Sequence, residues 1–529
     1  MLPGLFYKLG LFPSKSQIHE MLHCASDCSD RCSANCLSFG EFCVFSSELK
    51  NCYENQTPRP TPLSKISDQN GTRGKLLSTE TKSNLKYEVF LGGSCNPTTW
   101  RQNIAIPLLK KWRITYYNPQ VGHWKPELIE LENQAKENAE VLFFVIDNQT
   151  RSVASVIEAA HIAGCQKKLI LVVKEFQCPG QMILGEPLSE KEFQDLCHGQ
   201  AILQDVVERQ GIPVFDDIHK ALECTARLLR EGLWPQDLTL KDNAQPVCKA
   251  HVQLGDKLIK VYEAFNAMDT SNSGLLGLND VKMAFRILTN YDLTSEDLDA
   301  IIRTKKVNNS MDGNNKADDI TVTFDQFCCI VSEFKNKSSN GRCILKSIIV
   351  KTANVLNFFI LPLFKMMEWI VPRRRIRLAS HQHDVYLGGS CDTTSWREDI
   401  AIPILRKTGL TFFNPQTNYW SGNRFTPIEA TAIDNCRVLL FVITNTCRSL
   451  STMAIAAHYI GLNCKVVLCI QYLPENCIMN FDRLSVGSIK DYNRGRTYLS
   501  DLANRENIPV FDEIDEAVQC VVDKCKLNT

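Results

Sequence analysis

The segment TRSVASVIEAAHIAG carries three side chains that could do chemistry together: Ser152, Ser155 and Glu158. Hydroxyls near the start of a helix can simply cap the helix. A carboxylate can act as a nucleophile or as an acid–base group, although a glutamate in a helix most often faces solvent. The segment has a near twin, TCRSLSTMAIAAHYIG (446–461), in which Ile455 stands where Glu158 stood. If Glu158 does chemistry, the second segment has lost it.

A second group of candidate residues precedes this segment. Gly92, Gly93 and Ser94 follow an apolar run and open a stretch of helical spacing. Their backbone N–H groups could face a sugar or phosphate without a side chain in the way, and a tight turn is the alternative. Asp147 follows the apolar run VLFFVI. At the carboxyl end of a parallel strand, such a residue would lie near a ligand.

Both groups belong to a long internal repeat. The stretch YEVFLGGSCNPTTWRQNIAIPLLKKWRITYYNPQ (87–120) matches HDVYLGGSCDTTSWREDIAIPILRKTGLTFFNPQ (383–416) almost position by position. Near the end of each copy, GIPVFDDIHKALEC matches NIPVFDEIDEAVQC. The sequence therefore predicts two homologous domains, residues 85–231 and 383–526.

Within each copy, short runs rich in β-branched and aromatic residues alternate with stretches of helical spacing. Strands are predicted at Val89 to Leu91, Ile114 to Tyr117, Val141 to Ile146 and Leu169 to Val173, and a helix is predicted to end at Gly164. This alternation predicts an α/β fold with a doubly wound, mostly parallel sheet. We expect two such domains flanking an all-α module.

The pieces FLGGSC, IAIP, YNPQ, AKENAEVLFFVID, TRS and EAA together resemble the nucleoside 2-deoxyribosyltransferase-like domain family and its deoxynucleotide N-glycosidase relatives. The resemblance covers both repeats. It implies a carboxylate that attacks the anomeric carbon of a deoxyribonucleoside, so that the base leaves and the sugar passes to water or another base. It implies Glu158 as the nucleophile and Glu132 as the residue that orients the sugar or protonates the base, with Glu130 as a nearby competitor.

By the same resemblance, Ser152 and Ser155 would hold the sugar or its 5′-phosphate. The second copy keeps Glu429 at the position of Glu132 but has Ile455 at that of the nucleophile, so we expect it to be a pseudoenzyme. Two functions stay open. One is an N-glycosidase or deoxyribosyltransferase acting on a nucleoside or nucleotide through the first copy. The other is a calcium-responsive binding or signalling protein whose α/β domains no longer catalyse.

A different module, residues 245–335, lies between the copies. The stretch VYEAFNAMDTSNSGLLGLNDVKMAFRIL reads as helix, loop and helix, and it resembles an EF-hand. The loop 269–280 has oxygens at alternating positions around a turn at Gly274, as calcium requires. The candidate ligands are Asp269, Ser271, Ser273, the carbonyl of Leu275, and Asp280. Serines and a short carboxylate at the last position predict weak binding of Ca²⁺, or of Mg²⁺, with an inert structural loop as the alternative. A second hand, ending near residue 326, is predicted to be free of metal.

The chain has 529 residues, with 59 Lys and Arg against 59 Asp and Glu. This balance gives no global field that would attract nucleic acid, so we expect no nucleic-acid partner. The 23 cysteines are odd in number and scattered, and Lys8 interrupts the apolar N-terminus. These features indicate a reducing, cytoplasmic compartment. Residues 1–84 are predicted to be a Cys-rich, ill-ordered segment, with metal binding or redox chemistry as the alternative.

The apolar and basic stretch 343–377 could lie on an anionic membrane surface, but a connector packed on the domains is favoured. We also expect the two copies to pack as an internal pseudo-dimer, or the chain to form a homo-oligomer. The paired faces would include the helices with Ile104 to Leu109 and Ile400 to Leu405, unless these helices are buried within their own sheet layers.

Overall fold

The computed structural model divides the chain into two compact units, each built from two separated stretches. Unit 1 comprises Met1–Thr57 and Val252–Arg377, and unit 2 comprises Pro58–His251 and Leu378–Thr529. The residues that the structure describes are 2–29, 36–55, 87–121, 128–247, 254–271, 273–289, 293, 321–335, 383–390, 394–415, 427–479 and 482–526.

Unit 2 contains two five-stranded sheets of one topology, and all strands in each are parallel. The first has the order β2-β1-β3-β4-β7, with β1 (Tyr87–Gly93), β2 (Tyr116–Tyr117), β3 (Ala139–Ile146), β4 (Leu169–Val173) and β7 (Val214–Phe215). The second has the order β11-β10-β12-β13-β16, with β10 (His383–Gly389), β11 (Phe412–Phe413), β12 (Cys436–Ile443), β13 (Val466–Ile470) and β16 (Val510–Phe511). The prediction of two doubly wound α/β domains is confirmed.

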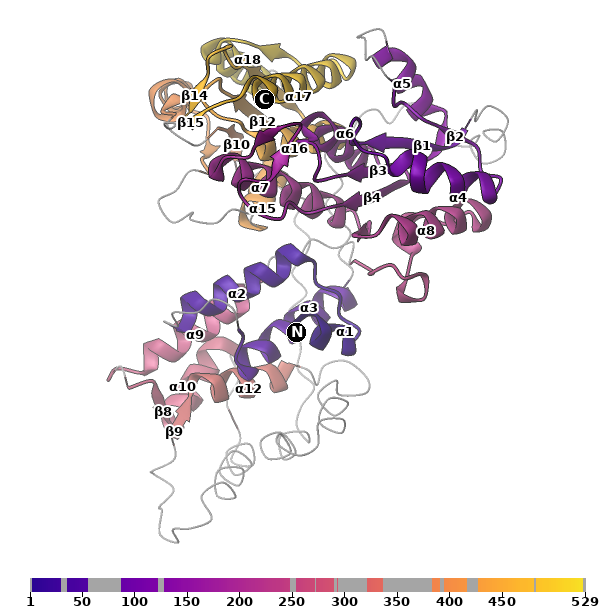
Figure 1. Ribbon diagram of the computed structural model, residues 1–529. Coiled ribbons are helices and arrows are strands. Elements are labelled where there is room, and N and C mark those ends of the chain that lie inside the picture. Colours follow the sequence, from indigo (N-terminus) through magenta and orange to yellow (C-terminus); the bar gives the residue numbers. More distant parts are fainter. Residues whose placement is uncertain are drawn as a thin grey trace, which may run out of the picture. The chain divides into compact units, whose positions relative to one another are not determined.

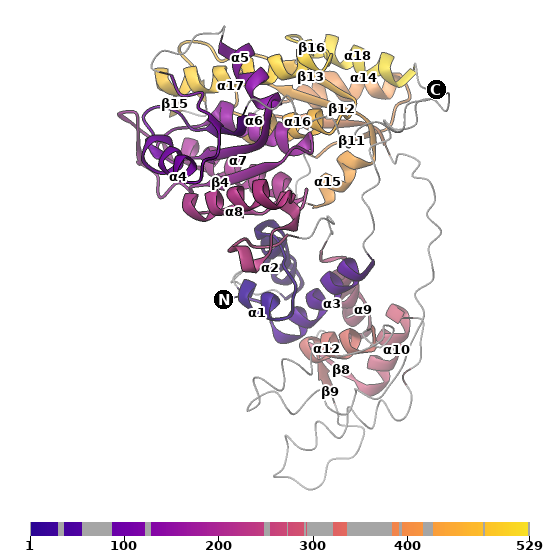
Figure 2. The same ribbon diagram turned by 90° about the vertical axis from the view of Figure 1, so that its right-hand side faces the viewer.

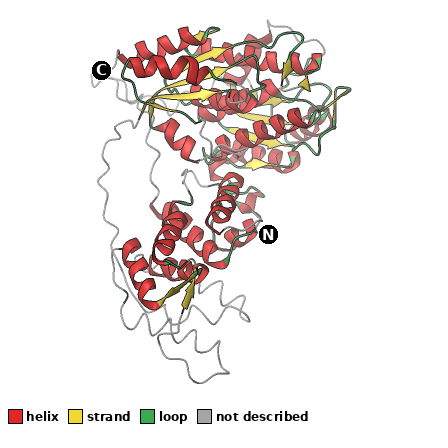
Figure 3. Ribbon diagram, turned by 90° about the vertical axis from the view of Figure 1, so that its left-hand side faces the viewer, coloured by secondary structure: helices red, strands yellow, loops and turns green. Residues whose placement is uncertain are grey.

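Helices cover both faces of each sheet (Figure 3). Successive side chains of a strand point to opposite faces, so in β1 Val89 and Leu91 face one layer and Phe90 faces the other. In the first copy the outer layer holds η3 (Arg101–Ala105), α4 (Ile106–Lys111) and α8 (Ile218–Glu231), and the inner layer holds α5 (Leu128–Glu137), α6 (Val153–Gly164) and α7 (Glu190–Glu208). The short 3-10 turns η4 (Pro235–Asp237) and η5 (Leu240–Asp242) follow α8.

The second copy repeats these layers. Its outer helices are η8 (Arg397–Ala401), α14 (Ile402–Lys407) and α18 (Ile514–Lys526), and its inner helices are α15 (Pro427–Asp434), α16 (Leu450–Gly461) and α17 (Val486–Arg505). Ala105 and Leu109, like Ala401 and Leu405, are buried against the strands of their own copy. The expectation that these helices form the contact between the copies is therefore wrong, and the alternative of burial within each sheet layer holds.

The inner faces of the two copies meet instead. Helix α6 packs against α16 and α17 (Figure 1). The buried side chains of both inner layers form one continuous apolar cluster. The helices approach closely at their last residues. A Cβ added to Gly164 would lie 2.3 Å from the carbonyl oxygen of His458, and one added to Gly461 would lie 2.3 Å from that of His161. Glycine is needed at both positions because the two helix backbones touch there.

Matching polar contacts cross the same boundary. Ser189 caps α7 and donates to Asp482 of the second copy at 2.6 Å, while Ser485 caps α17 and donates to Glu186 of the first copy at 2.6 Å. The acceptors lie on two short hairpins, β5 (Met182–Ile183) with β6 (Glu186–Pro187), and β14 (Ile478–Met479) with β15 (Asp482–Arg483). The two copies thus exchange equivalent hydrogen bonds, as the halves of a two-fold interface do.

Unit 1 is helical with one small sheet. Its elements are α1 (Leu2–Lys8), α2 (Lys15–Ser29), α3 (Phe39–Asn55), α9 (Asp256–Met268), β8 (Leu275–Gly277), α10 (Leu278–Thr289), β9 (Thr321–Thr323) and α12 (Phe324–Lys335). Helix α3 packs on α12 and α9, and the N–H of Gly40 donates to Asp325 at 2.6 Å. Within the segment 1–84, predicted to be ill-ordered, the described residues 2–29 and 36–55 form helices whose apolar side chains are buried; residues 56–84 lie outside the described part of the chain.

Among the described residues, no helix has the length and apolar character needed to cross a membrane. The connector 343–377, for which membrane-surface contact was weighed, lies outside the described residues.

Candidate functional site

Glu158 and Glu132 lie close together in the first α/β copy. Glu158 lies in the middle of α6, and Glu132 lies on α5, the helix that precedes the central strand β3. Both helices are labelled in Figure 2. Lys136, one turn after Glu132, places its Nζ atom 2.6 Å from Oε1 of Glu158, and both side chains of this ion pair are only about one eighth exposed (12% and 13%). The ammonium group also lies over the ring of Phe90, 5.7 Å from its centre.

Glu132 has a perturbed proton affinity. Its pKa is raised to about 7, mainly by burial and also by the negative charge of Glu158, while Lys136 and Arg494 act in the opposite direction. At neutral pH Glu132 is therefore protonated in a substantial fraction of molecules. Its competitor Glu130 lies exposed at the surface, where it accepts a hydrogen bond from Arg505 at 3.0 Å. Of the two, only Glu132 belongs to the site.

Helix α17 of the second copy completes the surroundings of this carboxyl pair. Gly495 of α17 crosses α6 so closely that an added Cβ would lie 2.4 Å from the side chain of Val153. On either side of this crossing, Arg494 lowers the pKa of Glu132, and the pKa of Tyr498 is raised by burial and by the charges of Glu158 and Glu132. The guanidinium of Arg494 lies 5.8 Å from the centre of the Tyr498 ring.

Ser94, Asp147 and Ser152 tie the ends of the neighbouring strands together. The hydroxyl of Ser94 is buried, accepts from the N–H of Asp147 at 2.8 Å and bonds to the hydroxyl of Ser152. Asp147 in turn accepts from the N–H of Gln149 at 2.6 Å, and burial raises its pKa. Ser152 adopts a left-handed backbone conformation (φ 51°) just before α6, and its side chain does not cap the helix. These residues hold the turn from which α6 starts.

Gly92 and Gly93 are part of strand β1 rather than of a ligand-facing loop. An added Cβ would lie 2.4 Å from the ring of Phe144 at Gly92, and 2.1 Å from the carbonyl oxygen of Val145 at Gly93. The N–H of Ser94 donates to that same carbonyl of Val145 at 2.8 Å. Glycine is required here by the close approach of β3, which gives a structural reason for these residues. Ser155 lies half-buried on α6, one turn before Glu158.

The second copy repeats the supporting contacts but not the charges. Ser390 bonds to Ser449 at 2.7 Å and accepts from the N–H of Thr444 at 3.1 Å, as Ser94 does in the first copy. Ile455 and Ile433 stand at the positions of Glu158 and Lys136, and both are buried. The copies therefore share the serine contacts that support the fold of the site, and they share the glutamate at positions 132 and 429, whereas the ion pair of Lys136 with Glu158 has no counterpart in the second copy.

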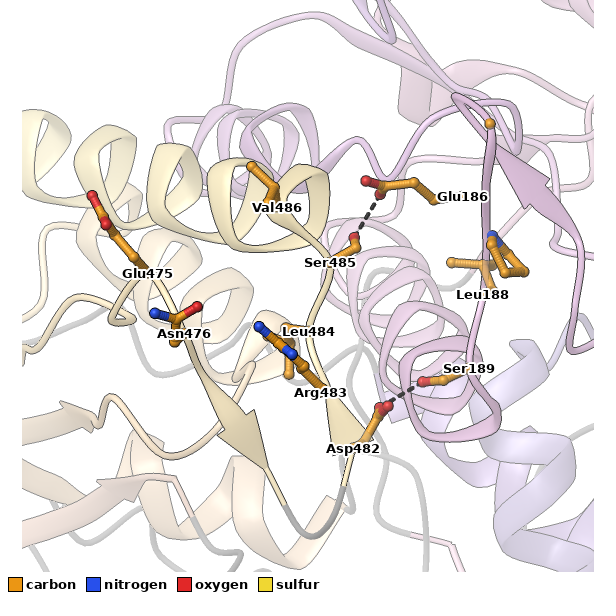
Figure 4. Close-up of a pocket in the computed structure, with 12 residues that line it drawn as sticks. Glu186, Leu188, Ser189, Glu475, Asn476, Asp482, Arg483, Leu484, Ser485 and Val486 are labelled. Atoms are coloured by element: carbon orange, nitrogen blue, oxygen red, sulfur yellow. Dashed lines mark hydrogen bonds between the residues drawn. The ribbon is translucent and has the colours of Figure 1, made fainter.

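A pocket of about 600 Å³ lies elsewhere, between the hairpins of the two copies (Figure 4). The hydrogen bonds from Ser189 to Asp482 and from Ser485 to Glu186 lie in its wall. Neither Glu132 nor Glu158 lines it. Four of its polar side chains take part in these contacts between the copies, and we assign no chemistry to it.

In unit 1 the loop after α9 is organised around one buried carboxylate. Asp269 accepts from the N–H groups of Ser273 and Gly274 at 3.0 and 2.7 Å, and from the hydroxyl of Ser271 at 3.1 Å. Gly274 has a left-handed conformation (φ 71°), and Leu275 begins strand β8, which pairs with β9. Among the described residues no group of three or more His, Cys, Asp or Glu side chains is placed to hold a metal ion. The loop supplies only oxygens, two of them from the carboxylates Asp269 and Asp280.

The parallel sheets with helices on both faces place the two domains among the doubly wound α/β proteins, a class in which ligands bind next to strand ends. Residues 86–176 and 382–473 each match the family model described as "Nucleoside 2-deoxyribosyltransferase like". Over these residues each α/β domain is deoxyribosyltransferase-like, as the two repeats predicted. No curated protein matches the chain.

Sequence reasoning missed Lys136, Arg494 and Tyr498. Lys136 had a visible signal, because it follows Glu132 by four residues and is replaced by Ile433 in the copy that has Ile455 in place of Glu158. The other two come from the opposite copy, so the alignment of the repeats could only show that they are matched by His198 and Ile202.

Proposed function

We propose that the first α/β domain is an N-glycosidase or deoxyribosyltransferase that acts on a deoxyribonucleoside or its monophosphate. The observation that carries this proposal is the unequal pair of carboxyl groups, Glu158 in an ion pair and Glu132 with a pKa of about 7. Cleavage of a glycosidic bond with a covalent intermediate needs one ionised carboxylate as nucleophile and one protonated carboxyl group as acid.

In the first step the Glu158 carboxylate forms a bond to the anomeric carbon while the bond from that carbon to the base nitrogen breaks. The electron pair of the broken bond goes to the base, and the proton of Glu132 neutralises it. In the second step Glu132 takes a proton from water, or from the nitrogen of a second base. The resulting nucleophile attacks the anomeric carbon and frees Glu158.

The test is to incubate the full chain with deoxynucleosides and their 5′-monophosphates and to measure the free base by chromatography. We expect Glu158→Gln to lower base release by several orders of magnitude, since loss of a covalent nucleophile removes a whole pathway. Glu429→Gln, at the equivalent position of Glu132 in the second copy, is the matched control and should release base at the wild-type rate. Equal rates in Glu158→Gln and wild type would exclude Glu158 as the nucleophile.

A second proposed function concerns unit 1. We infer that the loop 269–280 is an EF-hand-like site for Ca²⁺, or Mg²⁺, of low affinity, and that β8 and β9 join it to a degenerate partner. The support is the turn at Gly274 and the folding of the loop around Asp269, whose carboxylate accepts from the N–H groups of Ser273 and Gly274 and from the hydroxyl of Ser271. With two carboxylates and two serine hydroxyls, the negative charge is low for a calcium site, which predicts weak binding.

Calorimetric titration of the full chain with CaCl₂ tests this function. One weak site is expected, abolished in Asp269→Ala and kept in Asp325→Ala, where the carboxylate lies outside the loop. Two sites of similar affinity would contradict a metal-free second hand. If calcium binds while no base is released from any substrate, the protein is better described as a calcium-responsive binding protein with pseudoenzyme domains.

A further inference from the structure

The ion pair between Lys136 and Glu158 is the best-defined charged contact of the site. The two groups are 2.6 Å apart, and their side chains are 12% and 13% exposed. Lys136 is held from two further sides, by a hydrogen bond to the side chain of Asn133 at 3.2 Å and by the ring of Phe90. A long side chain that is fixed in this way gives its partner a defined position.

In the second copy both members of the ion pair are replaced by apolar residues. Ile433 and Ile455 occupy their positions, and both are buried in the apolar cluster between the copies. Removing one member of a buried pair leaves an uncompensated charge, which is far more costly than replacing both by apolar residues. The joint replacement within one chain indicates that Lys136 and Glu158 form a single unit.

The charged and titratable groups around Glu158 come from every neighbouring element. Glu132 lies on α5 with Lys136, Cys95 follows β1, His161 lies one turn further along α6, and Arg494 and Tyr498 come from α17. Glu132 and Lys136 are four residues apart and therefore lie on one face of α5. The Lys136 ammonium is bound to Glu158, whereas Glu132 is the carboxyl group of the site with the raised pKa.

We propose that Lys136 is a positioning residue of the reaction: its ammonium group keeps the Glu158 carboxylate ionised and in place, and thereby makes Glu132 the proton donor. The kinetic part of this inference rests on the proposed N-glycosidase or transferase function. The ion pair itself can be tested without any substrate.

The first experiment measures melting temperatures of the full chain at pH 5 and pH 8 for the wild type, Lys136→Met, Glu158→Gln and the double variant. Lys136→Met leaves the mostly buried Glu158 carboxylate without its ion-pair partner. An uncompensated buried charge is costly, so that variant should be least stable at high pH, where carboxyl groups are charged. We expect it to melt at least 5 °C below the double variant at pH 8, with a smaller gap at pH 5. Equal melting temperatures of single and double variants at both pH values would overturn the proposal.

The second experiment measures the pH dependence of kcat for base release. In Lys136→Met the rise of kcat on the acid side of the pH profile should move to higher pH by about one unit or more. At pH 6, kcat should fall at least tenfold, with a smaller change in KM. Lys136→Arg should restore the wild-type profile. A uniform loss at all pH values that Lys136→Arg does not restore would overturn the positioning role.

Lys168→Met provides a matched control, because Lys168 forms a similar ion pair with Glu140, at 2.9 Å, outside the site. Its pH profile should equal that of the wild type. If the wild type releases no base from any substrate, the proposed function fails, and the melting temperatures alone then decide whether Lys136 holds the charge of Glu158.

Discussion

At the scale of single residues, the chemistry proposed for the first copy depends on which side chains carry a proton and which carry a charge. Glu132 is the clearest case, since its pKa of about 7 lies well above the usual value of 4.5. A carboxyl group with a raised folded-state pKa binds more protons in the folded state than in the unfolded one. Its contribution to stability is complete below about pH 4.5 and is lost as the pH rises through about 7.

We therefore predict that Glu132→Gln is more stable than the wild type at pH 8, by about 1–2 kcal/mol once solvent screening is allowed for. The difference should vanish near pH 4, where the carboxyl group is protonated in both states. Urea unfolding at the two pH values measures it. The same variant should lose catalytic rate, and a variant that is less stable than the wild type at pH 8 would contradict the buried position of Glu132.

His161 should have the opposite pH dependence. The pKa of His161 is lowered from 6.5 to about 4, mainly by burial and also by the positive charges of Lys167 and Lys136. The unfolded chain then takes up a proton between pH 6.5 and 4 that the folded chain does not, so stability falls as the pH is lowered through this range. His161→Gln should lose about 2 kcal/mol less than the wild type between pH 7 and pH 4.5 in urea unfolding. Parallel losses would show that His161 is protonated in the folded protein.

At the scale of elements, the contact between α6 and α16 depends on two glycines. Gly164→Ala must separate the helix backbones, since the new Cβ would lie 2.3 Å from the carbonyl oxygen of His458. We predict a loss of about 1–3 kcal/mol in the free energy of unfolding. Gly461→Ala should cost a similar amount, and the double variant less than the sum, because one outward shift relieves both clashes.

Gly180→Ala is the control for this comparison. Gly180 has a left-handed conformation (φ 80°) with nothing within 4 Å of an added Cβ, so its substitution measures the backbone strain alone, about 1 kcal/mol. If Gly164→Ala costs no more than this control and is additive with Gly461→Ala, the two helices are not in contact at that point.

The central strands and the end of α6 could be predicted from the sequence, whereas the residues that pack against them could not. The repeat and its alternating runs predicted β3, β4 and the end of α6 at Gly164, because these segments are buried on both sides and carry a clear pattern. The strand β1 is longer than predicted and includes Gly92 and Gly93. Those glycines read as a turn because nothing in their own segment reveals that Phe144 and Val145 lie against them.

The candidate site was predicted in the same unequal way. The Ile455 contrast and the family resemblance led to Glu158 and Glu132, yet Arg494 and Tyr498 lie more than 300 residues further along the chain. Their place beside Glu158 follows from the packing of α17 on α6. Each sheet has an outer and an inner helical layer, and both layers are apolar. The sequence pattern therefore does not show which layer forms the contact between the copies.

At the scale of the whole molecule, the two units alternate along the chain, with each copy of the α/β domain following a piece of unit 1. The inner layer of the first copy is covered by the inner layer of the second. We predict that a chain ending at residue 251 exposes this apolar layer and is recovered mainly in the insoluble fraction. Coexpression of residues 378–529 should increase the soluble amount severalfold. Equal solubility with and without the second fragment would contradict the shared apolar cluster.

The alternating order of the two units also determines when their parts become available during translation. About 150 residues separate the two copies, and at 5–20 residues per second the ribosome needs about 8–30 s to make them. Throughout this time the finished first copy has no second copy to cover its apolar layer. Helices α1 to α3 are made even longer before their packing partners α9 and α12. A nascent chain in this state is a substrate for chaperones that hold exposed apolar surface. The protein therefore matures only after most of its chain has left the ribosome, so a premature stop anywhere before the second copy yields a product that cannot complete either unit 2 or its carboxylate site.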